Sequence, residues 1–230
     1  GFHEFLGRLV SIIFSVFAVY YLYLLSRDTF GEKVAEWACL IYSVLPLNAF
    51  YASSFQPESA FMAFSIAGIY YLCEWSRSEN SAHLLFSAVL ISLACLLKLT
   101  NLYLGLPLLY TFLKKYGRDA FARKEFWFYG AIALLPVAAW YRYSHNIYLS
   151  YGLTFGIWDY GSGKWLNSDF LKFNFWYSFL FISVIVKHFA LFGAPLFAAG
   201  LFYKEPDGRR PVTIFDIWLA AFVIYVFIAA

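Results

Sequence analysis

The sequence predicts an all-α membrane protein, a polytopic bundle of about seven or eight transmembrane helices with one further segment at the outer surface. Of its 230 residues, 62% are hydrophobic and 13% are charged, and the mean hydropathy is +0.65. Soluble domains contain about 45–50% apolar and about 25% charged residues, and a domain of this size keeps a large wetted exterior. The aromatic content of 23% excludes a disordered chain.

Apolar runs of membrane-spanning length recur along the chain. A helix needs roughly 20 apolar residues to cross a bilayer core, and its backbone groups must be paired internally in lipid. The predicted spans are residues 6–25, 34–52, 57–75, 83–98, 101–114, 125–143, 186–203 and 214–230. The short runs 83–98 and 101–114 are either tilted against each other or enter from opposite sides, with polar ends meeting near Lys98. Prolines 46, 107 and 136 lie inside spans and predict kinks.

The basic residues predict the orientation of these spans. Eleven of the seventeen Lys and Arg residues lie in alternate loops: Arg27, Lys33, Arg77, Lys114, Lys115, Arg118, Arg123, Lys124, Lys204, Arg209 and Arg210. Short cytoplasmic loops carry an excess of basic residues, so these loops are predicted to be cytoplasmic. Glu58, Lys98 and residues 144–185 then share the outer face.

The segment 144–185 differs from the spans. Its first part is rich in Gly, Trp and Tyr, which is typical of interfacial anchoring. We expect an interfacial or re-entrant helix at about 168–185, followed by a bend near Lys187. The chain therefore divides into a transmembrane core of about six spans (1–143), the outer segment (144–185) and two further spans (186–230). It begins with Gly and ends in an apolar run, and we interpret it as a piece of a longer protein.

Several function classes have no support in the sequence. The three cysteines lie in apolar runs without Cys-x-x-Cys spacing, so neither a disulfide framework nor a zinc site is indicated. The basic residues form no stripe that would indicate nucleic-acid binding. No P-loop, His-Glu-x-x-His helix or nucleophile elbow is present.

The candidate site residues are polar side chains on the predicted outer face. Glu58 follows Pro57 at the start of a span, where the positive end of the helix dipole favours an anion. It is either an ordinary helix-start carboxylate or one that faces an outer cleft as a metal ligand or hydrogen-bond acceptor. Gln56, in the same outer motif, is a candidate for substrate binding.

Three further side chains could meet a substrate or a metal ion. Lys98 lies between two spans, where it either snorkels to the interface or binds a lipid phosphate as a point charge. Arg8 could also meet a phosphate, or simply flank its span. His145 is either an amphipathic residue at the membrane interface or a metal ligand.

The order of these features resembles that of the GT-C glycosyltransferases of the protein O-mannosyltransferase and aminoarabinose-transferase type. The resemblance covers most of residues 1–143. It is carried by Gly7-Arg8-Leu9-Val10-Ser11, Leu24-Leu25-Ser26-Arg27-Asp28-Thr29-Phe30-Gly31, Ser53-Ser54-Phe55-Gln56-Pro57-Glu58, Leu93-Ala94-Cys95-Leu96-Leu97-Lys98-Leu99-Thr100 and Leu134-Leu135-Pro136-Val137-Ala138-Ala139-Trp140-Tyr141.

This resemblance implies a GT-C-type membrane enzyme that moves a sugar from a polyprenyl-phosphate carrier to a lipid, glycan or protein acceptor. Lys98 and Arg8 would contact the carrier phosphate, and Glu58 would be a supporting carboxylate that could hold a divalent ion. The family's acidic general base belongs to a first outer loop, which would lie upstream of Gly1. We expect a multi-pass protein of a prokaryotic plasma membrane, active outward in cell-envelope protein or lipid glycosylation.

Two other functions remain open at this point. A secondary transporter or lipid flippase would show inverted repeats around a polar midplane site, and no repeat is visible. An oligosaccharide polymerase or ligase would share the carrier lipid, so only its product would distinguish it. The piece itself could also be a non-catalytic scaffold.

Overall fold

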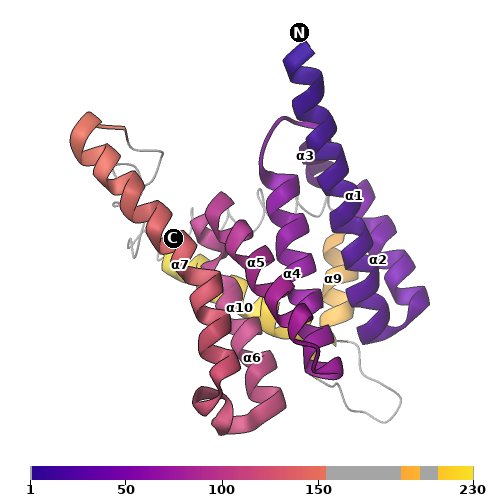
Figure 1. The fold of residues 1–230 in the computed structure, drawn as a ribbon. Coiled ribbons are helices and arrows are strands. Elements are labelled where there is room, and N and C mark those ends of the chain that lie inside the picture. The colour runs from indigo at the N-terminus through magenta and orange to yellow at the C-terminus, as the bar shows by residue number, and fades with distance from the viewer. Residues whose placement is uncertain (1, 154–192, 203–211, 230) are drawn as a thin grey trace. The chain divides into compact units, whose positions relative to one another are not determined.

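The computed structural model describes residues 2–153, 193–202 and 212–229, and every regular element in these ranges is a helix (Figure 1). This confirms the all-α prediction. The described residues form nine α-helices and two short 3-10 helices: α1 (Phe2–Phe30), α2 (Glu32–Val44), α3 (Pro46–Ser53), α4 (Glu58–Ser78), α5 (Ser81–Leu97), η1 (Leu99–Leu104), α6 (Gly105–Tyr116), η2 (Gly117–Ala122), α7 (Lys124–Tyr151), α9 (Gly193–Phe202) and α10 (Ile214–Ala229).

Local backbone chemistry explains where the helices end. Gly31 has φ +92°, a conformation that L side chains rarely adopt, and it separates α1 from α2. Leu45 is extended at φ −62° and ψ 126°, because a residue that precedes proline disfavours the helical region. Pro46 then starts α3 at an angle of 68° to α2. The predicted span 34–52 therefore consists of two helices with a sharp break, and the kink expected at Pro46 is present.

Contacts divide the chain into two compact units. The first contains the described residues within Gly1–Ser59 and Ser168–Thr213. In it, α1 packs against both α2 and α3. Fully buried alanines, Ala18 in α1 and Ala35 in α2, allow close helix approach. The opposite face of α1 remains apolar and exposed, as at Val16 (64% exposed), which is expected of a surface that meets lipid.

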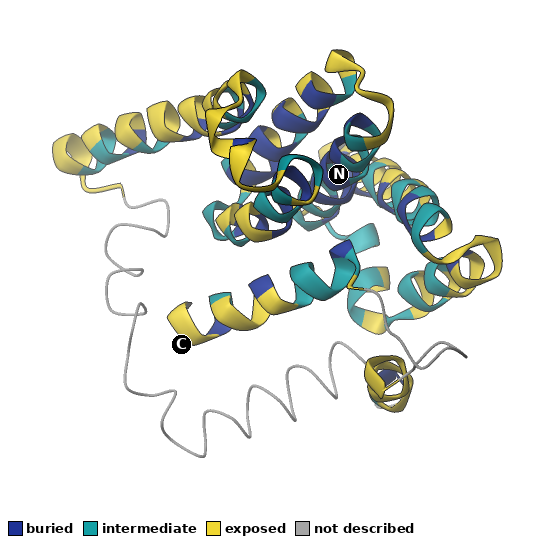
Figure 2. Cartoon of the chain, turned by 90° about the horizontal axis from the view of Figure 1, so that it is seen from below, coloured by how far each residue is buried: buried dark blue, intermediate teal, exposed yellow. Residues whose placement is uncertain are grey.

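The second unit contains the described residues within Ala60–Asn167 and Ile214–Ala230. Here α5 packs along α7, and α10 packs on α6 and η1. Phe112 is buried between Trp75 and Tyr129, with ring-centroid distances of 4.8 and 5.6 Å. The last turns of α10, which lead to the C label in Figure 2, are largely exposed.

Polar contacts hold three helices of this second unit together. Ser87 of α5 donates a hydrogen bond to the carbonyl of Gly68 in α4 at 2.6 Å and lies 3.0 Å from the hydroxyl of Tyr129 in α7. Ile91 occupies the space that a side chain at residue 68 would need. Gly68 therefore permits the close approach of α4 and α5.

By length and apolar composition, one helix in the described part of the chain could cross a membrane, His3–Phe30. The number becomes two if the bent pair α2 and α3 forms one span. Helices α5, α9 and α10 are apolar but shorter. The predicted junction between the runs 83–98 and 101–114 contains an extra element, η1, so that α6 begins only at Gly105.

The kink predicted at Pro107 is contradicted by the structure, whereas the one predicted at Pro136 stays a prediction. Pro107 lies in the first turn of α6, where its missing N–H would have no helical partner, and the expected mid-span kink is wrong. Pro136 lies inside α7, which continues through it as one helix. That helix extends to Tyr151, past the expected end at 143. The expected re-entrant helix at 168–185, the bend near Lys187 and the basic loop at Lys204 lie outside the described residues.

Candidate functional site

In the first unit, the turn between α3 and α4 packs on the first turns of α1. The ring of Phe55 lies directly against the backbone of Gly7, which is buried. The hydroxyl of Ser11 lies 3.4 Å from the carbonyl of Gln56. At the start of α4, Ser59 donates a hydrogen bond to the carbonyl of Tyr51 at 3.0 Å. These contacts hold residues 54–58 against the α1 end that carries Arg8.

Arg8 projects from α1 one residue after Gly7. Its guanidinium donates a hydrogen bond to Glu4 one turn earlier at 2.6 Å, and the two side chains are 56% and 60% exposed. An exposed ion pair of this kind contributes little to stability. A guanidinium has five N–H donors, so binding to Glu4 does not use up its capacity to bind an anion.

Glu58 is the first residue of α4 and directly follows Pro57, which confirms the predicted helix start. The side chain is half-buried, and its Oε2 atom is shielded from solvent. The carboxylate therefore lies at the positive end of the helix, as an N-terminal acidic residue should. Gln56 lies two residues earlier and is exposed.

In the second unit, Lys98 ends α5. Its backbone is extended, at φ −145° and ψ 113°, and its N–H donates to the carbonyl of Ala94 at 3.0 Å. A cation at this position interacts favourably with the negative end of the helix dipole. The half-buried side chain places Nζ 5.2 Å from the ring centroid of Phe61, a cation–π contact.

Asn101 supports this turn and was not among the predicted site residues. It is completely buried, and its N–H donates to the carbonyl of Lys98 at 3.0 Å. Its side-chain Nδ2 donates to Ser65 at 3.2 Å and to the carbonyl of Ala94 at 3.1 Å. The only sequence signal for this role is a polar residue between two apolar runs, which does not reveal its burial.

His145 lies in α7, half-buried, with its ring 6.1 Å from that of Tyr148. It belongs to the second unit, whereas Glu58 belongs to the first. Among the described residues, no group of three or more His, Cys, Asp or Glu side chains could hold a metal ion. Divalent cations take several oxygen ligands, so the described side chains do not by themselves form such a site.

The structure thus groups the predicted residues by unit. Arg8, Gln56 and Glu58 lie at one end of the first unit, where the turn before α4 meets α1. Lys98 ends a helix of the second unit and is supported by Asn101. Each charged candidate stands at or near a helix end, which is typical of polytopic helical membrane proteins.

This arrangement, apolar helices with charged side chains at their ends, is the one expected of a helical membrane protein. A family model described as dolichyl-phosphate-mannose-protein mannosyltransferase matches residues 1–143, and the chain belongs to that family. It is thereby placed among the membrane glycosyltransferases that use a polyprenyl-phosphate sugar donor, with the acceptor unspecified. This confirms the resemblance seen in the sequence. No curated protein and no solved structure matches the chain significantly.

Proposed function

We propose that this chain forms part of a glycosyltransferase that moves a sugar from a polyprenyl-phosphate carrier to a lipid, glycan or protein acceptor at the outer face of a prokaryotic plasma membrane. The observation that carries the proposal is the family match over residues 1–143. The matched region includes Arg8, Gln56, Glu58 and Lys98. The same observation favours transfer over transport, because the family is defined by sugar transfer.

Lys98 is proposed to contact the carrier phosphate. Negative charge grows on the phosphate as its bond to the sugar breaks, and a fixed cation stabilises that charge. The ring of Phe61 and the backbone hydrogen bonds of the turn hold the ammonium in place. An ammonium carries three N–H donors and can bind several oxygen atoms at once, those of a phosphate included.

Arg8, Gln56 and Glu58 are proposed to act from the first unit. Arg8 is proposed to bind the carrier phosphate, and Gln56 is proposed to hydrogen-bond to the substrate. Glu58 would be a supporting carboxylate and at most one ligand of a divalent ion. The proposal assigns the general base to no residue of this chain.

The proposed topology has seven or eight spans, with residues 144–185 and the ends near Glu58 and Lys98 on the outer face. The alternation of basic loops supports this orientation. The three-part division at residues 143 and 185 belongs to the same proposal.

The test is sugar transfer from a polyprenyl-phosphate donor by membranes that contain the full-length protein. We expect Lys98→Gln to lower turnover by about 10²-fold or more, as loss of one transition-state donor typically does. Lys98→Arg should retain part of the activity, and Glu58→Gln should also lose transfer. The control is Lys33→Gln, which removes an exposed lysine in the first turn of α2.

Thermal unfolding in detergent must show that the variants remain folded. Near-normal turnover of folded Lys98→Gln and Glu58→Gln would remove these residues from the site. Uptake of an unmodified substrate into proteoliposomes, with no transfer product, would replace the proposed function by transport.

A further inference from the structure

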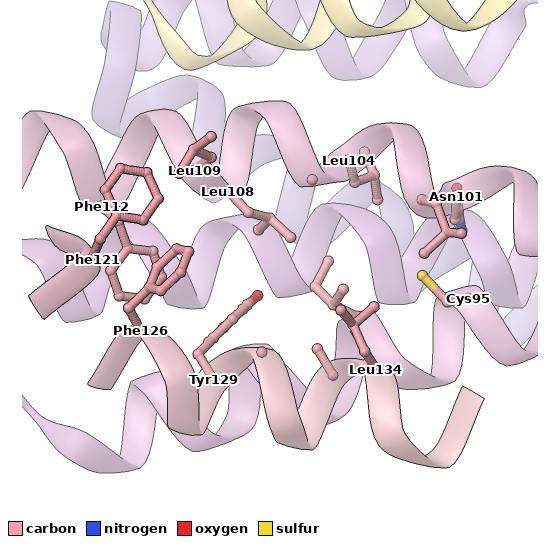
Figure 3. Close-up of a pocket in the computed structure, with 15 residues that line it drawn as sticks. Cys95, Asn101, Leu104, Leu108, Leu109, Phe112, Phe121, Phe126, Tyr129 and Leu134 are labelled. Carbon is pink, nitrogen blue, oxygen red and sulfur yellow. The ribbon is translucent and has the colours of Figure 1, made fainter. Parts of the chain in front are cut away.

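An apolar crevice lies within the second unit, between α6 and α7 (Figure 3). Its volume is about 340 Å³, and its lining comes from α5, η1, α6, η2 and α7. Leu108 and Phe112 form one wall, and Tyr129 and Leu134 lie on the opposite helix. Nearly the whole accessible lining is hydrocarbon, so the crevice fits an apolar ligand.

The crevice opens to the surface. Two lining residues, Phe121 and Leu134, are 50% and 49% exposed, so they form a rim. Gly105 and Gly130 also line the crevice, and a side-chain carbon added at either would meet no atom within 4 Å. The open space therefore reaches the surface and is large enough for part of one hydrocarbon chain.

One end of the crevice is joined to a basic turn. Phe121, which lines this end together with Phe112 and Phe126, belongs to η2. The indole of Trp127 donates a hydrogen bond to the carbonyl of Phe121 at 2.9 Å, which fixes η2 onto the start of α7. The shape of this end is therefore set by the backbone.

Four exposed basic residues surround this turn, namely Lys114, Arg118, Arg123 and Lys124. In the part of the chain that the structure describes, none of the four forms an ion pair. The neighbouring Lys115, by contrast, is paired with Glu79. Arg123 and Lys114 instead lie over the rings of Tyr116 and Tyr110. Exposed Trp127 (65%) adds an aromatic side chain of the kind found at membrane interfaces.

We propose that the crevice and its basic rim bind one anionic phospholipid. One acyl chain would lie between α6 and α7, and the headgroup phosphate would contact Arg118, Arg123 and Lys124. Basic residues near a membrane surface attract anionic lipids, and the apolar crevice continues from the same turn. This proposal does not depend on the sugar-transfer reaction.

The test measures lipids retained by the protein after release from nanodiscs that contain equal amounts of phosphatidylglycerol and phosphatidylcholine, by native mass spectrometry. We expect one retained phosphatidylglycerol. The variant Arg118→Gln with Lys124→Gln should lower the preference for phosphatidylglycerol by about tenfold or more. The matched control, Lys33→Gln with Arg77→Gln, removes two exposed basic residues outside the rim and should keep the preference.

A second pair of variants tests the crevice. Gly130→Leu fills it and should lower retention of both lipids, and Gly105→Leu is an alternative if that variant misfolds. The control is Gly200→Leu in α9, where an added side chain also meets nothing. The proposal would be overturned if folded Gly130→Leu retained as much lipid as the wild-type protein. It would also be overturned if the wild-type protein showed no preference for phosphatidylglycerol, or if the control pair lost that preference equally. Complete displacement of the lipid by soluble glycerol phosphate would show a phosphate site and would also overturn it.

Discussion

Asn101 and Ser65 form a buried hydrogen bond, in which Nδ2 of Asn101 donates to Oγ of Ser65 at 3.2 Å. The hydroxyl of Ser65 already donates to the carbonyl of Phe61 at 2.7 Å, so it must accept from Asn101. The second partner of Nδ2, the carbonyl of Ala94, is also an acceptor. The amide orientation is therefore determined, and the side chain connects α4 to the end of α5 next to Lys98.

This geometry predicts that Asn101→Asp is more harmful than Asn101→Leu. A carboxylate cannot donate to Ser65 or Ala94 and would be a buried charge, whereas leucine leaves both groups with their other partners. We expect Asn101→Leu to lower the free energy of unfolding by about 1 kcal/mol and Asn101→Asp by several times more. Both losses of unfolding free energy can be measured by labelling buried Cys95 with a thiol-reactive dye during heating. Equal losses would contradict the assigned orientation.

Lys115 should contribute more to stability than its neighbour Lys114. Its side chain is only 9% exposed, and Nζ donates to the carbonyl of Ser76 at 2.9 Å and to Glu79 at 3.0 Å. Lys115→Met keeps the apolar stem but leaves a carbonyl in the last turn of α4 without this partner, which costs about 1–3 kcal/mol. Lys114→Met is the matched control and should change little. Thermal unfolding in detergent compares the two, and similar effects would contradict the bridging role.

Asn80 should act as the N-terminal cap of α5. Its side chain accepts a hydrogen bond from the N–H of Ala82 at 2.9 Å. Asn80→Ala leaves that donor without its cap and should cost about 1 kcal/mol, whereas Asn80→Asp keeps an acceptor and should be nearly neutral. The unfolding midpoint in detergent is the measurement, and equal midpoints for the two variants would show that the cap has no energetic role.

Gly7 and Phe55 should be energetically coupled. A side chain on residue 7 would overlap the Phe55 ring, so Gly7→Ala must displace the ring or the turn before α4, at about 1–3 kcal/mol. Phe55 is 72% exposed, so Phe55→Ala alone should cost less. The double variant should recover most of the Gly7→Ala loss. A double-mutant cycle on unfolding free energies measures the coupling, and strict additivity would show that the contact is absent in solution.

Local signals were enough to predict several features. Pro57 followed by Glu58 correctly predicted a helix start, because proline and an acidic residue both favour the first turn. The break near Lys98 was also predicted, since a charged residue interrupts two apolar runs. The position of Pro46 indicated a bend but not its size of 68°, which depends on how α2 and α3 pack against α1.

Other features could not be predicted from local signals. Asn101 is a polar residue in a short loop by sequence, yet its burial depends on Ser65, which lies in another helix. The same holds for Lys115, whose partners are the carbonyl of Ser76 in α4 and the carboxylate of Glu79 just after that helix. Helix α6 begins at Gly105 instead of 101, because η1 intervenes and packs on α5 and α10.

The sequence by itself determined the environment and the class of this protein. Its apolar runs require helices in lipid, since unpaired backbone groups are costly there, and its motifs over residues 1–143 mark the family. Only the tertiary structure decided how polar side chains are used. Lys115 forms an internal ion pair with Glu79, whereas Arg118 stays exposed. The crevice beside Phe121 exists only because residues from α5, η1, α6, η2 and α7 come together around it. Such contacts join residues distant in sequence, and their energies depend on burial and geometry that local patterns do not specify.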